Sequence, residues 1–149
     1  MTSISRSALV PYSAREMYDL VADIESYPEF LPWCGGAGIV SHDEKQVVAS
    51  IKIAYHKIHK TFTTRNVLQP GASMEMQLVE GPFRHLHGLW RFDALDSRSS
   101  RISLDIEFDF SNRVVALALG PVFGNIANTL VESFRQRAVA VYGGRVWQG

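Results

Sequence analysis

Residues 100–110 read Ser-Arg-Ile-Ser-Leu-Asp-Ile-Glu-Phe-Asp-Phe, and from Arg101 onward polar and apolar side chains alternate without a break. Successive side chains of a β-strand point to opposite faces of the sheet, so this alternation indicates one wet face and one buried face. The buried face would carry Ile102, Leu104, Ile106, Phe108 and Phe110. The stretch therefore predicts an antiparallel strand that covers a core on one side only.

The same two-residue period extends upstream of this strand. We expect further strands near residues 38–42, 46–56, 58–68, 73–79 and 86–95, separated by short polar or glycine-containing turns. A weaker alternation over residues 3–10 stops at Pro11, which predicts a strand near a sheet edge. Seven strands would present one large apolar surface, which other elements must cover.

Two short helical segments lie between the first two expected strands. Ser13-Ala-Arg-Glu16 has the pattern of a capping box, and Met17, Leu20 and Val21 follow at helical spacing. After this helix, Pro28 can begin a single helical turn, and Pro32 has to end it. Neither segment is long enough to cover the sheet alone.

The C-terminal third contains eighteen consecutive residues, 114–131, without an ionisable side chain. Gly120, Pro121, Gly124 and two asparagines interrupt its apolar surface, which argues against a membrane span. We interpret the stretch as a mobile apolar entry segment, 114–119, followed by a helix of about 22 residues from Pro121 to Gly143. The expected sheet-facing stripe is Val122, Ile126, Leu130, Phe134, Ala138 and Val141. These elements predict an α+β fold in which a seven-stranded, curved antiparallel sheet wraps around a long C-terminal helix.

Composition restricts the classes of function. The chain has 149 residues, 46% of them apolar, and its formal net charge is zero, which fits a single domain over residues 1–149 with no general attraction to DNA. Cys34 is the only cysteine, so an intrachain disulfide and a cysteine zinc site are both excluded. The N-terminus lacks a secretion signal, so we expect a bacterial cytoplasmic protein, with peripheral contact at the inner membrane left open.

No common catalytic motif is present, and the candidate acid and metal clusters point outward. Asp105, Glu107 and Asp109 share the wet face of their strand, which favours a solvated surface over an acid/base site. His85 and His87 also share a face, but no third metal ligand accompanies them. We therefore expect no catalytic residue, no metal and no required cofactor.

One basic patch interrupts this neutral composition. Lys52, Lys57, Lys60 and Arg65 lie in one predicted hairpin together with two histidines. Such a patch can contact the phosphates of anionic lipid or of RNA. An equally open alternative is a solvated hairpin that balances acidic residues elsewhere and protects the sheet edge from aggregation.

Large aromatic side chains are numerous for so small a core. Most of them fall on predicted inner strand faces, where they can simply pack in the interior. Phe30, Trp33 and Phe83 differ because they lie in loops bounded by Pro28, Pro32 and the Gly81-Pro82 pair. Such loops are typical of the rim of a pocket.

Four blocks occur in order with the expected strands and helices between them: Tyr27-Pro-Glu-Phe-Leu-Pro-Trp-Cys34, Glu80-Gly-Pro-Phe83, Leu86-His-Gly-Leu-Trp-Arg-Phe92 and Phe134-Arg-Gln-Arg-Ala138. Over nearly the whole chain this pattern resembles the coenzyme Q-binding protein and ribosome association toxin (RatA) family of START-like domains. The resemblance implies the helix-grip fold.

The resemblance also implies a noncatalytic cavity for ubiquinone or a related isoprenoid lipid, in support of respiration or quinone biosynthesis. Polar groups that could meet a quinone head are Asn125, Asn128, Tyr55 and the Trp33 indole. The expected cavity and rim residues are Tyr27, Phe30, Trp33, Tyr55, Phe83, Trp90, Phe108, Phe110, Val122, Phe123, Ile126 and Leu130.

The same resemblance supports a competing function, a toxin that keeps the two ribosomal subunits apart. In that case the basic hairpin, together with Arg84 and Arg135, would contact the ribosome. An enzymatic function ranks third: aromatase and cyclase proteins share the implied fold, but the sequence shows no buried acid/base pair.

Overall fold

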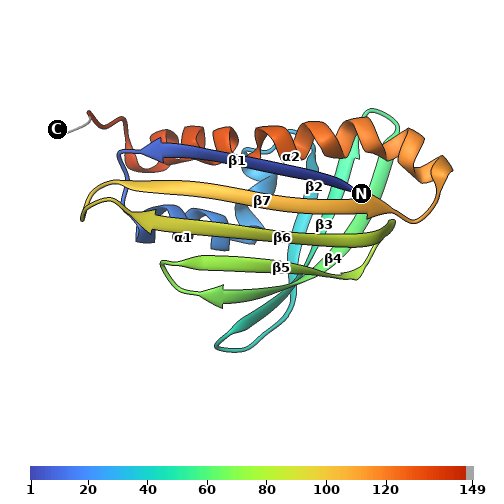
Figure 1. Ribbon diagram of the computed structural model, residues 1–149, viewed down its shortest axis with the longest axis horizontal. Coiled ribbons are helices and arrows are strands. Elements are labelled where there is room, and N and C mark those ends of the chain that lie inside the picture. The colour runs from blue at the N-terminus through green and yellow to red at the C-terminus, as the bar shows by residue number, and fades with distance from the viewer. Residues whose placement is uncertain (147–149) are drawn as a thin grey trace.

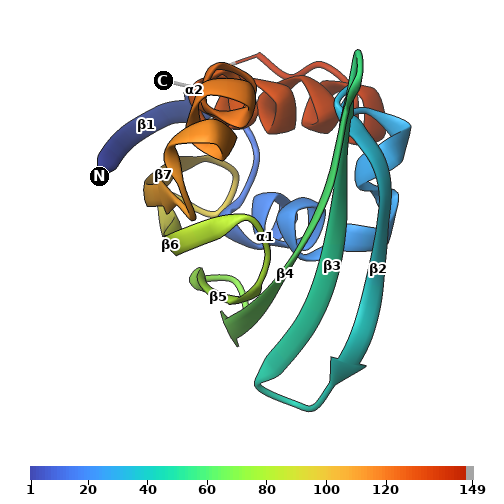
Figure 2. The ribbon, with the colours of Figure 1, turned by 90° about the vertical axis from the view of Figure 1, so that its right-hand side faces the viewer.

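The computed structural model describes residues 1–146, and its seven strands form one antiparallel sheet in the order β1-β7-β6-β5-β4-β3-β2 (Figure 1). The elements are β1 (Thr2–Val10), α1 (Ala14–Ala22), the 3₁₀ helix η1 (Ile24–Glu29), β2 (Cys34–His42), β3 (Gln46–Tyr55), β4 (Ile58–Gln69), β5 (Ser73–Glu80), β6 (Phe83–Ala94), β7 (Ser100–Phe110) and α2 (Arg113–Tyr142). The sheet curves so that α1 lies on its concave side and α2 lies across its opening (Figure 2). The predicted helix-grip fold, with two short helices between the first two strands, is confirmed.

Strand β7 has the one-sided character that its sequence predicts. It pairs with β1 on one side and β6 on the other, and Ile106 of β7 lies opposite Ile4 and Gly88. All five of its apolar inner residues are buried, whereas the intervening polar residues are exposed or half-buried. The concave face of the sheet is therefore apolar where it meets the helices.

The capping box of α1 is present as predicted. Ser13 Oγ accepts a hydrogen bond from the Glu16 amide at 3.1 Å, and Glu16 Oε1 accepts one from the Ser13 amide at 2.9 Å. These two bonds pair backbone donors that the first turn of a helix otherwise leaves free. Helix α1 then buries Met17 and Val21 against the sheet side of the core.

The prediction for the start of the C-terminal helix was wrong. Residues 114–119 are not a separate entry segment, because α2 runs without a break from Arg113 to Tyr142. Asn112 begins it by accepting a hydrogen bond from the Val115 amide at 2.9 Å. Pro121 is tolerated because it lies on the exposed side, where water can bond the Leu117 carbonyl that a proline leaves unpaired.

The buried face of α2 is also shifted from the predicted stripe. Ile126, Phe134 and Ala138 are buried as predicted, but Val141 is 49% exposed and Leu130 is half-buried. The residues that face the core are Leu119, Phe123, Ile126, Ala127, Val131, Phe134 and Ala138. The centre of the buried face is thus rotated by only about 30° from the predicted one, since successive helical residues advance by about 100°.

By length and composition alone, helix α2 is long and apolar enough to cross a membrane, and 28% of its most apolar 18-residue stretch is buried inside the protein. The buried part holds the sheet-facing residues, and the exposed part includes Val114 and Leu117, which are 76% and 75% exposed. The helix therefore has a packed side and an apolar outer side in its first turns.

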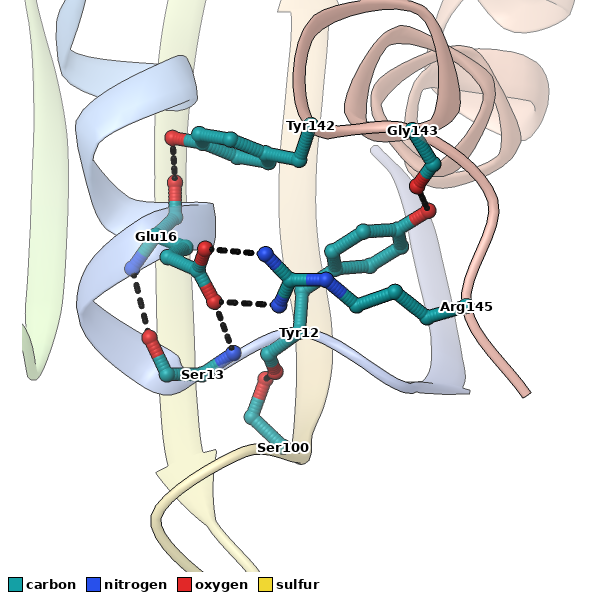
Figure 3. A network of polar contacts seen from close by, with 7 residues as sticks. All are labelled: Tyr12, Ser13, Glu16, Ser100, Tyr142, Gly143 and Arg145. Carbon is teal, nitrogen blue, oxygen red and sulfur yellow. Dashed lines mark hydrogen bonds and ion pairs between the residues drawn. The ribbon is translucent and has the colours of Figure 1, made fainter. Parts of the chain in front are cut away.

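The end of α2 is tied to the start of α1 by a polar network (Figure 3). Arg145 donates two hydrogen bonds to the Glu16 carboxylate, Nη1 to Oε1 at 2.8 Å and Nη2 to Oε2 at 2.7 Å. The Tyr142 hydroxyl donates to the Glu16 carbonyl at 2.9 Å, and the Tyr12 hydroxyl donates to the Gly143 carbonyl at 2.7 Å. These bonds hold the end of α2 against α1 and against Tyr12, which lies between β1 and α1.

Candidate functional site

An apolar cavity lies between the concave face of the sheet and α2. Its volume is about 60 Å³. It is lined by Ile24, Tyr27, Trp33, Ile51, Phe62, Thr64, Asn66, Met76, Leu86, Trp90, Ile106, Phe123, Ile126, Ala127, Leu130 and Phe134. Ligand pockets usually measure about 300–1,000 Å³, so a ligand larger than a few water molecules has to displace side chains here.

Two lining residues can move at low cost. Every lining residue is buried except Met76 and Leu130, which are half-buried. The Met76 side chain lies over Gly88, where a Cβ would collide with the Met76 methyl group. Because methionine has three rotatable bonds and adapts to irregular spaces, Met76 is the lining group best suited to make room.

Besides Phe134 of α2, three aromatic rings form one wall of the cavity. Trp90 and Tyr27 both meet Phe134 of α2 edge to face, with ring centres 5.3 Å and 5.5 Å away. Trp33 is the third ring and comes from the loop after η1. Burial raises the pKa of Tyr27, and its hydroxyl donates to the Val21 carbonyl, so this phenol is neutral and already paired. The wall therefore offers flat apolar surface with no charge.

Thr64 and Asn66 are the polar exception in this lining. Both lie on the inner face of β4, only 3% and 2% exposed, and the Thr64 hydroxyl donates to Asn66 Oδ1 at 2.8 Å. Sequence reasoning missed this pair. The available signal was the alternation over 62–68, which puts residues 64 and 66 on the same face as Phe62.

A phenylalanine cluster lies behind one wall of the cavity. Phe123 of α2 meets Phe108, Phe83 and Phe110, with ring centres 4.7 Å, 4.9 Å and 6.3 Å apart. Phe62 also meets Phe123, with ring centres 6.2 Å apart, and of these five rings only Phe123 and Phe62 line the cavity itself. The expected ligand residues Phe83, Phe108 and Phe110 thus support the wall from behind.

The structure brings six of the twelve expected ligand residues together. The six that line the cavity are Tyr27, Trp33, Trp90, Phe123, Ile126 and Leu130. Phe30 packs instead on Phe134, with ring centres 5.2 Å apart, and lies under the Arg137 guanidinium. Val122 is half-buried outside the lining.

The expected head-group donors of α2 and the hairpin lie away from the cavity. Asn125 and Asn128 are exposed, and the Asn128 side chain bonds to Arg6 and to the Gly124 carbonyl. Tyr55 lies near the tip of the β3–β4 hairpin and is 43% exposed. Of the expected donors, only Trp33 borders the cavity.

The four basic residues belong to the β3–β4 hairpin, whose tip reaches the level of α2 (Figure 2). Lys52 and Arg65 alternate along their strands with buried residues and therefore point to the outer face of the sheet. Lys60 lies opposite Ile53 and therefore points to the inner face, and Lys57 lies in the turn. All four are exposed. Within residues 1–146 none of these four forms an ion pair. Their charge is open to solvent.

The acidic residues of β7 find partners on the neighbouring strand. Asp105 pairs with Arg91 at 3.0 Å, and Asp109 pairs with Arg84 at 3.5 Å. Glu107 Oε1 lies 3.0 Å from His85 Nε2. Arg135 is bound to Glu132, so this arginine and Arg84 are both already in ion pairs. In the part of the chain that the structure describes, no three potential metal ligands lie together.

Comparison with protein families places most of the chain in a known family. A family described as polyketide cyclase / dehydrase and lipid transport matches residues 10–135. The chain is similar to the ribosome association toxin RatA of Pseudomonas aeruginosa, 49% identical over 142 residues, covering 95% of this chain and 99% of that protein. It is also similar to RatA of Escherichia coli, 46% identical over 145 residues, covering 97% of this chain and 92% of that protein.

A more distant relative carries a different name. The mitochondrial coenzyme Q-binding protein COQ10 homolog B of Xenopus laevis is 25% identical over 143 residues, covering 93% of this chain and 59% of that protein. Among solved structures, the Zhui aromatase/cyclase of Streptomyces has a TM-score of 0.81 at 18% identity and covers 97% of this chain and 99% of its own. An 18 kDa protein of Caulobacter crescentus has a TM-score of 0.74 at 27% identity, covering 97% of this chain and all of its own.

Proposed function

This chain belongs to the polyketide cyclase / dehydrase and lipid transport family, and from its near full-length similarity to ribosome association toxins we propose that it binds a ribosomal subunit and prevents subunit association. The observation that carries the proposal is the 49% identity to a protein of that name, spread over 95% of this chain. Identity at about half of the positions of the chain has to include surface residues as well as core residues. The place of action would be the cytoplasm, where ribosomes are.

The basic hairpin supports this proposal and supplies its contact surface. Cations without an internal partner are free to meet phosphates, and among the described residues Lys57 in the turn and Lys60 beside it meet that condition near the hairpin tip. Lys52 and Arg65 are also unpaired, but they face the opposite side of the sheet. Tyr55, exposed in the same hairpin, offers a ring for stacking on a base. Arg84 and Arg135 contribute less, because each is already bound to a carboxylate.

Pelleting of purified ribosomal subunits with the protein tests the contact surface. We expect Lys60→Glu to weaken co-sedimentation, and the loss should be smaller at high salt because the contact is electrostatic. Lys45→Glu makes the same change in charge at the β2–β3 turn, the opposite end of the sheet (Figure 2), and serves as the matched control. Equal binding by wild type and both variants would contradict a role for the hairpin.

The cavity supports a second candidate function, noncatalytic binding of ubiquinone or another isoprenoid lipid. Its lining is apolar and aromatic, and none of its residues is an aspartate, glutamate, histidine or lysine. That lining offers surface for a greasy molecule and no acid/base pair for chemistry. Extraction of the purified protein with organic solvent, followed by mass spectrometry, tests this function. Bound quinone is the expected result, and a protein that stays empty after incubation with ubiquinone would contradict it.

A further inference from the structure

The amide nitrogen of Asn66 has no partner within the described residues. The Thr64 hydroxyl donates to Asn66 Oδ1 at 2.8 Å, which orients the amide with its oxygen toward Thr64 and its NH₂ group away from it. No hydrogen bond from Nδ2 to residues 1–146 exists, although Asn66 is only 2% exposed. A buried polar group without a partner is uncommon in proteins, because its desolvation is not compensated.

The residue that carries the unpaired NH₂ group borders the cavity. Asn66 and Thr64 both line it, and none of the fully enclosed polar side-chain atoms in residues 1–146 lacks a partner. Nδ2 is therefore not sealed in the core, and it lies where it can reach a molecule in the cavity. Two N–H donors are available there for an acceptor oxygen.

The other lining groups define what kind of molecule that oxygen can belong to. The hydroxyl of Tyr27 is committed to the Val21 carbonyl, and no lining residue carries a charge. A carboxylate or phosphate would therefore enter without a counter-charge, which is strongly unfavourable in an apolar site. The flat surfaces of Trp33 and Trp90 fit a planar ring.

We infer that Asn66 is the polar anchor of the cavity and that it selects uncharged, hydrophobic ligands with a ring carbonyl, as in a quinone, over hydrocarbons and over charged lipids. This inference rests on the proposed ligand-binding function of the cavity. Asn66 Nδ2 donates to the carbonyl oxygen, Thr64 holds the amide in the required orientation, and Met76 moves to admit the ring. The anchor is on β4, an interior strand of the sheet, and not on α2.

Affinities for two probes of similar chain length test the inference: decylubiquinone, which has ring carbonyls, and decylbenzene, which has none. The test variant is Thr64→Val combined with Asn66→Leu, which removes both partners of the internal hydrogen bond and leaves no orphaned group. We expect the affinity for decylubiquinone to fall about 10-fold, equal to 1.4 kcal/mol, while the affinity for decylbenzene is kept or rises. Thermal unfolding of the variant confirms that it folds.

A second measurement uses the wild-type protein alone. The side-chain NH₂ resonances of Asn66 in ¹H–¹⁵N spectra should shift on addition of decylubiquinone and stay in place on addition of decylbenzene. Loss of decylubiquinone affinity in the variant together with this shift supports the inference.

Four outcomes overturn it. Unchanged decylubiquinone affinity in the variant, or unmoved Asn66 resonances, overturns the anchor and leaves ligand binding by the cavity standing. A preference of the wild type for the reduced quinol, whose hydroxyls donate, would show that the amide oxygen faces the ligand. Failure of the wild type to bind either probe overturns the cavity function together with the anchor.

Discussion

Arg145, which follows α2, forms a bidentate ion pair with Glu16 in the first turn of α1, with Nη1–Oε1 and Nη2–Oε2 distances of 2.8 Å and 2.7 Å (Figure 3). The hydrogen bonds from Arg145 are the largest of the effects that lower the pKa of Glu16 from 4.5 to about 2. The charged form of Glu16 is thus favoured in the folded protein relative to the unfolded chain, and this part of the stability depends on pH.

Replacement of this carboxylate tests the pair. Glu16→Gln keeps an acceptor for the Ser13 amide but loses the charge, and we expect it to reduce the free energy of unfolding by about 1 kcal/mol at neutral pH. The contribution of Glu16 is complete above pH 4.5 and disappears as pH falls from 4.5 toward about 2. Urea unfolding of both proteins should therefore show a difference that shrinks on acidification. A difference that is constant or grows would contradict the assignment.

The turn between β5 and β6 requires a glycine. Gly81 has φ +152°, and a Cβ there would lie 2.7 Å from the Phe62 Cβ. We expect Gly81→Ala to lower the free energy of unfolding by about 1–3 kcal/mol, through both backbone strain and the clash.

Gly124 offers the matched control for that substitution. It lies within α2, and a Cβ there would meet nothing within 4 Å. Gly124→Ala should therefore raise the free energy of unfolding by about 0.5–1 kcal/mol, because alanine favours the helix. Chemical denaturation of the two variants checks that the free energy of unfolding falls in Gly81→Ala and rises in Gly124→Ala. Equal effects would contradict the described difference between the two positions.

Phe123 connects the cavity to the phenylalanine cluster. Its ring meets Phe62, Phe83 and Phe108, and it is 3% exposed. Phe123→Ala should lower the free energy of unfolding by about 3 kcal/mol and enlarge the cavity. Leu117→Ala removes an apolar side chain from the same helix at a 75% exposed position, and its effect should stay within about 0.5 kcal/mol. A comparable decrease in both variants would argue against close packing of α2 on the sheet.

Local patterns predicted the elements of this fold well, because each pattern reports on a single strand or turn. The alternation over 100–110 identifies β7, and the Ser13–Glu16 pattern identifies the start of α1. The start of α2 was missed because Gly120 and Pro121 look like a helix N-terminus, whereas Asn112 caps the helix eight residues earlier. A proline on the exposed side of a helix leaves no local sign that the helix continues through it.

The functional groups were harder to predict, because they depend on contacts between distant segments. Thr64 and Asn66 are polar, and nothing local shows that their strand face is covered by Phe123 and its neighbours on α2. Arg145 meets Glu16 across 129 positions of sequence, which no periodicity reveals. The basic hairpin was recognisable from composition, but only the structure shows that Arg84 and Arg135 have partners while Lys57 and Lys60 have none among the described residues.

Charge on the hairpin should also determine how salt affects ribosome binding. Affinity falls less steeply with rising salt when fewer cations of the protein meet phosphates. Lys57→Glu combined with Lys60→Glu should therefore bind subunits more weakly and with a shallower salt dependence than wild type. The content of bound lipid should not change, since neither residue lines the cavity. Parallel loss of lipid and ribosome binding would instead indicate a folding defect.

The most direct test of the central claim is a sucrose-gradient profile of ribosomal subunits mixed under associating conditions with the purified protein. We predict fewer intact ribosomes and larger peaks of separate subunits as protein is added. The Lys57→Glu, Lys60→Glu variant should have a weaker effect, and Lys45→Glu should act as wild type. A profile that stays unchanged at saturating protein would contradict the proposal that this chain prevents subunit association.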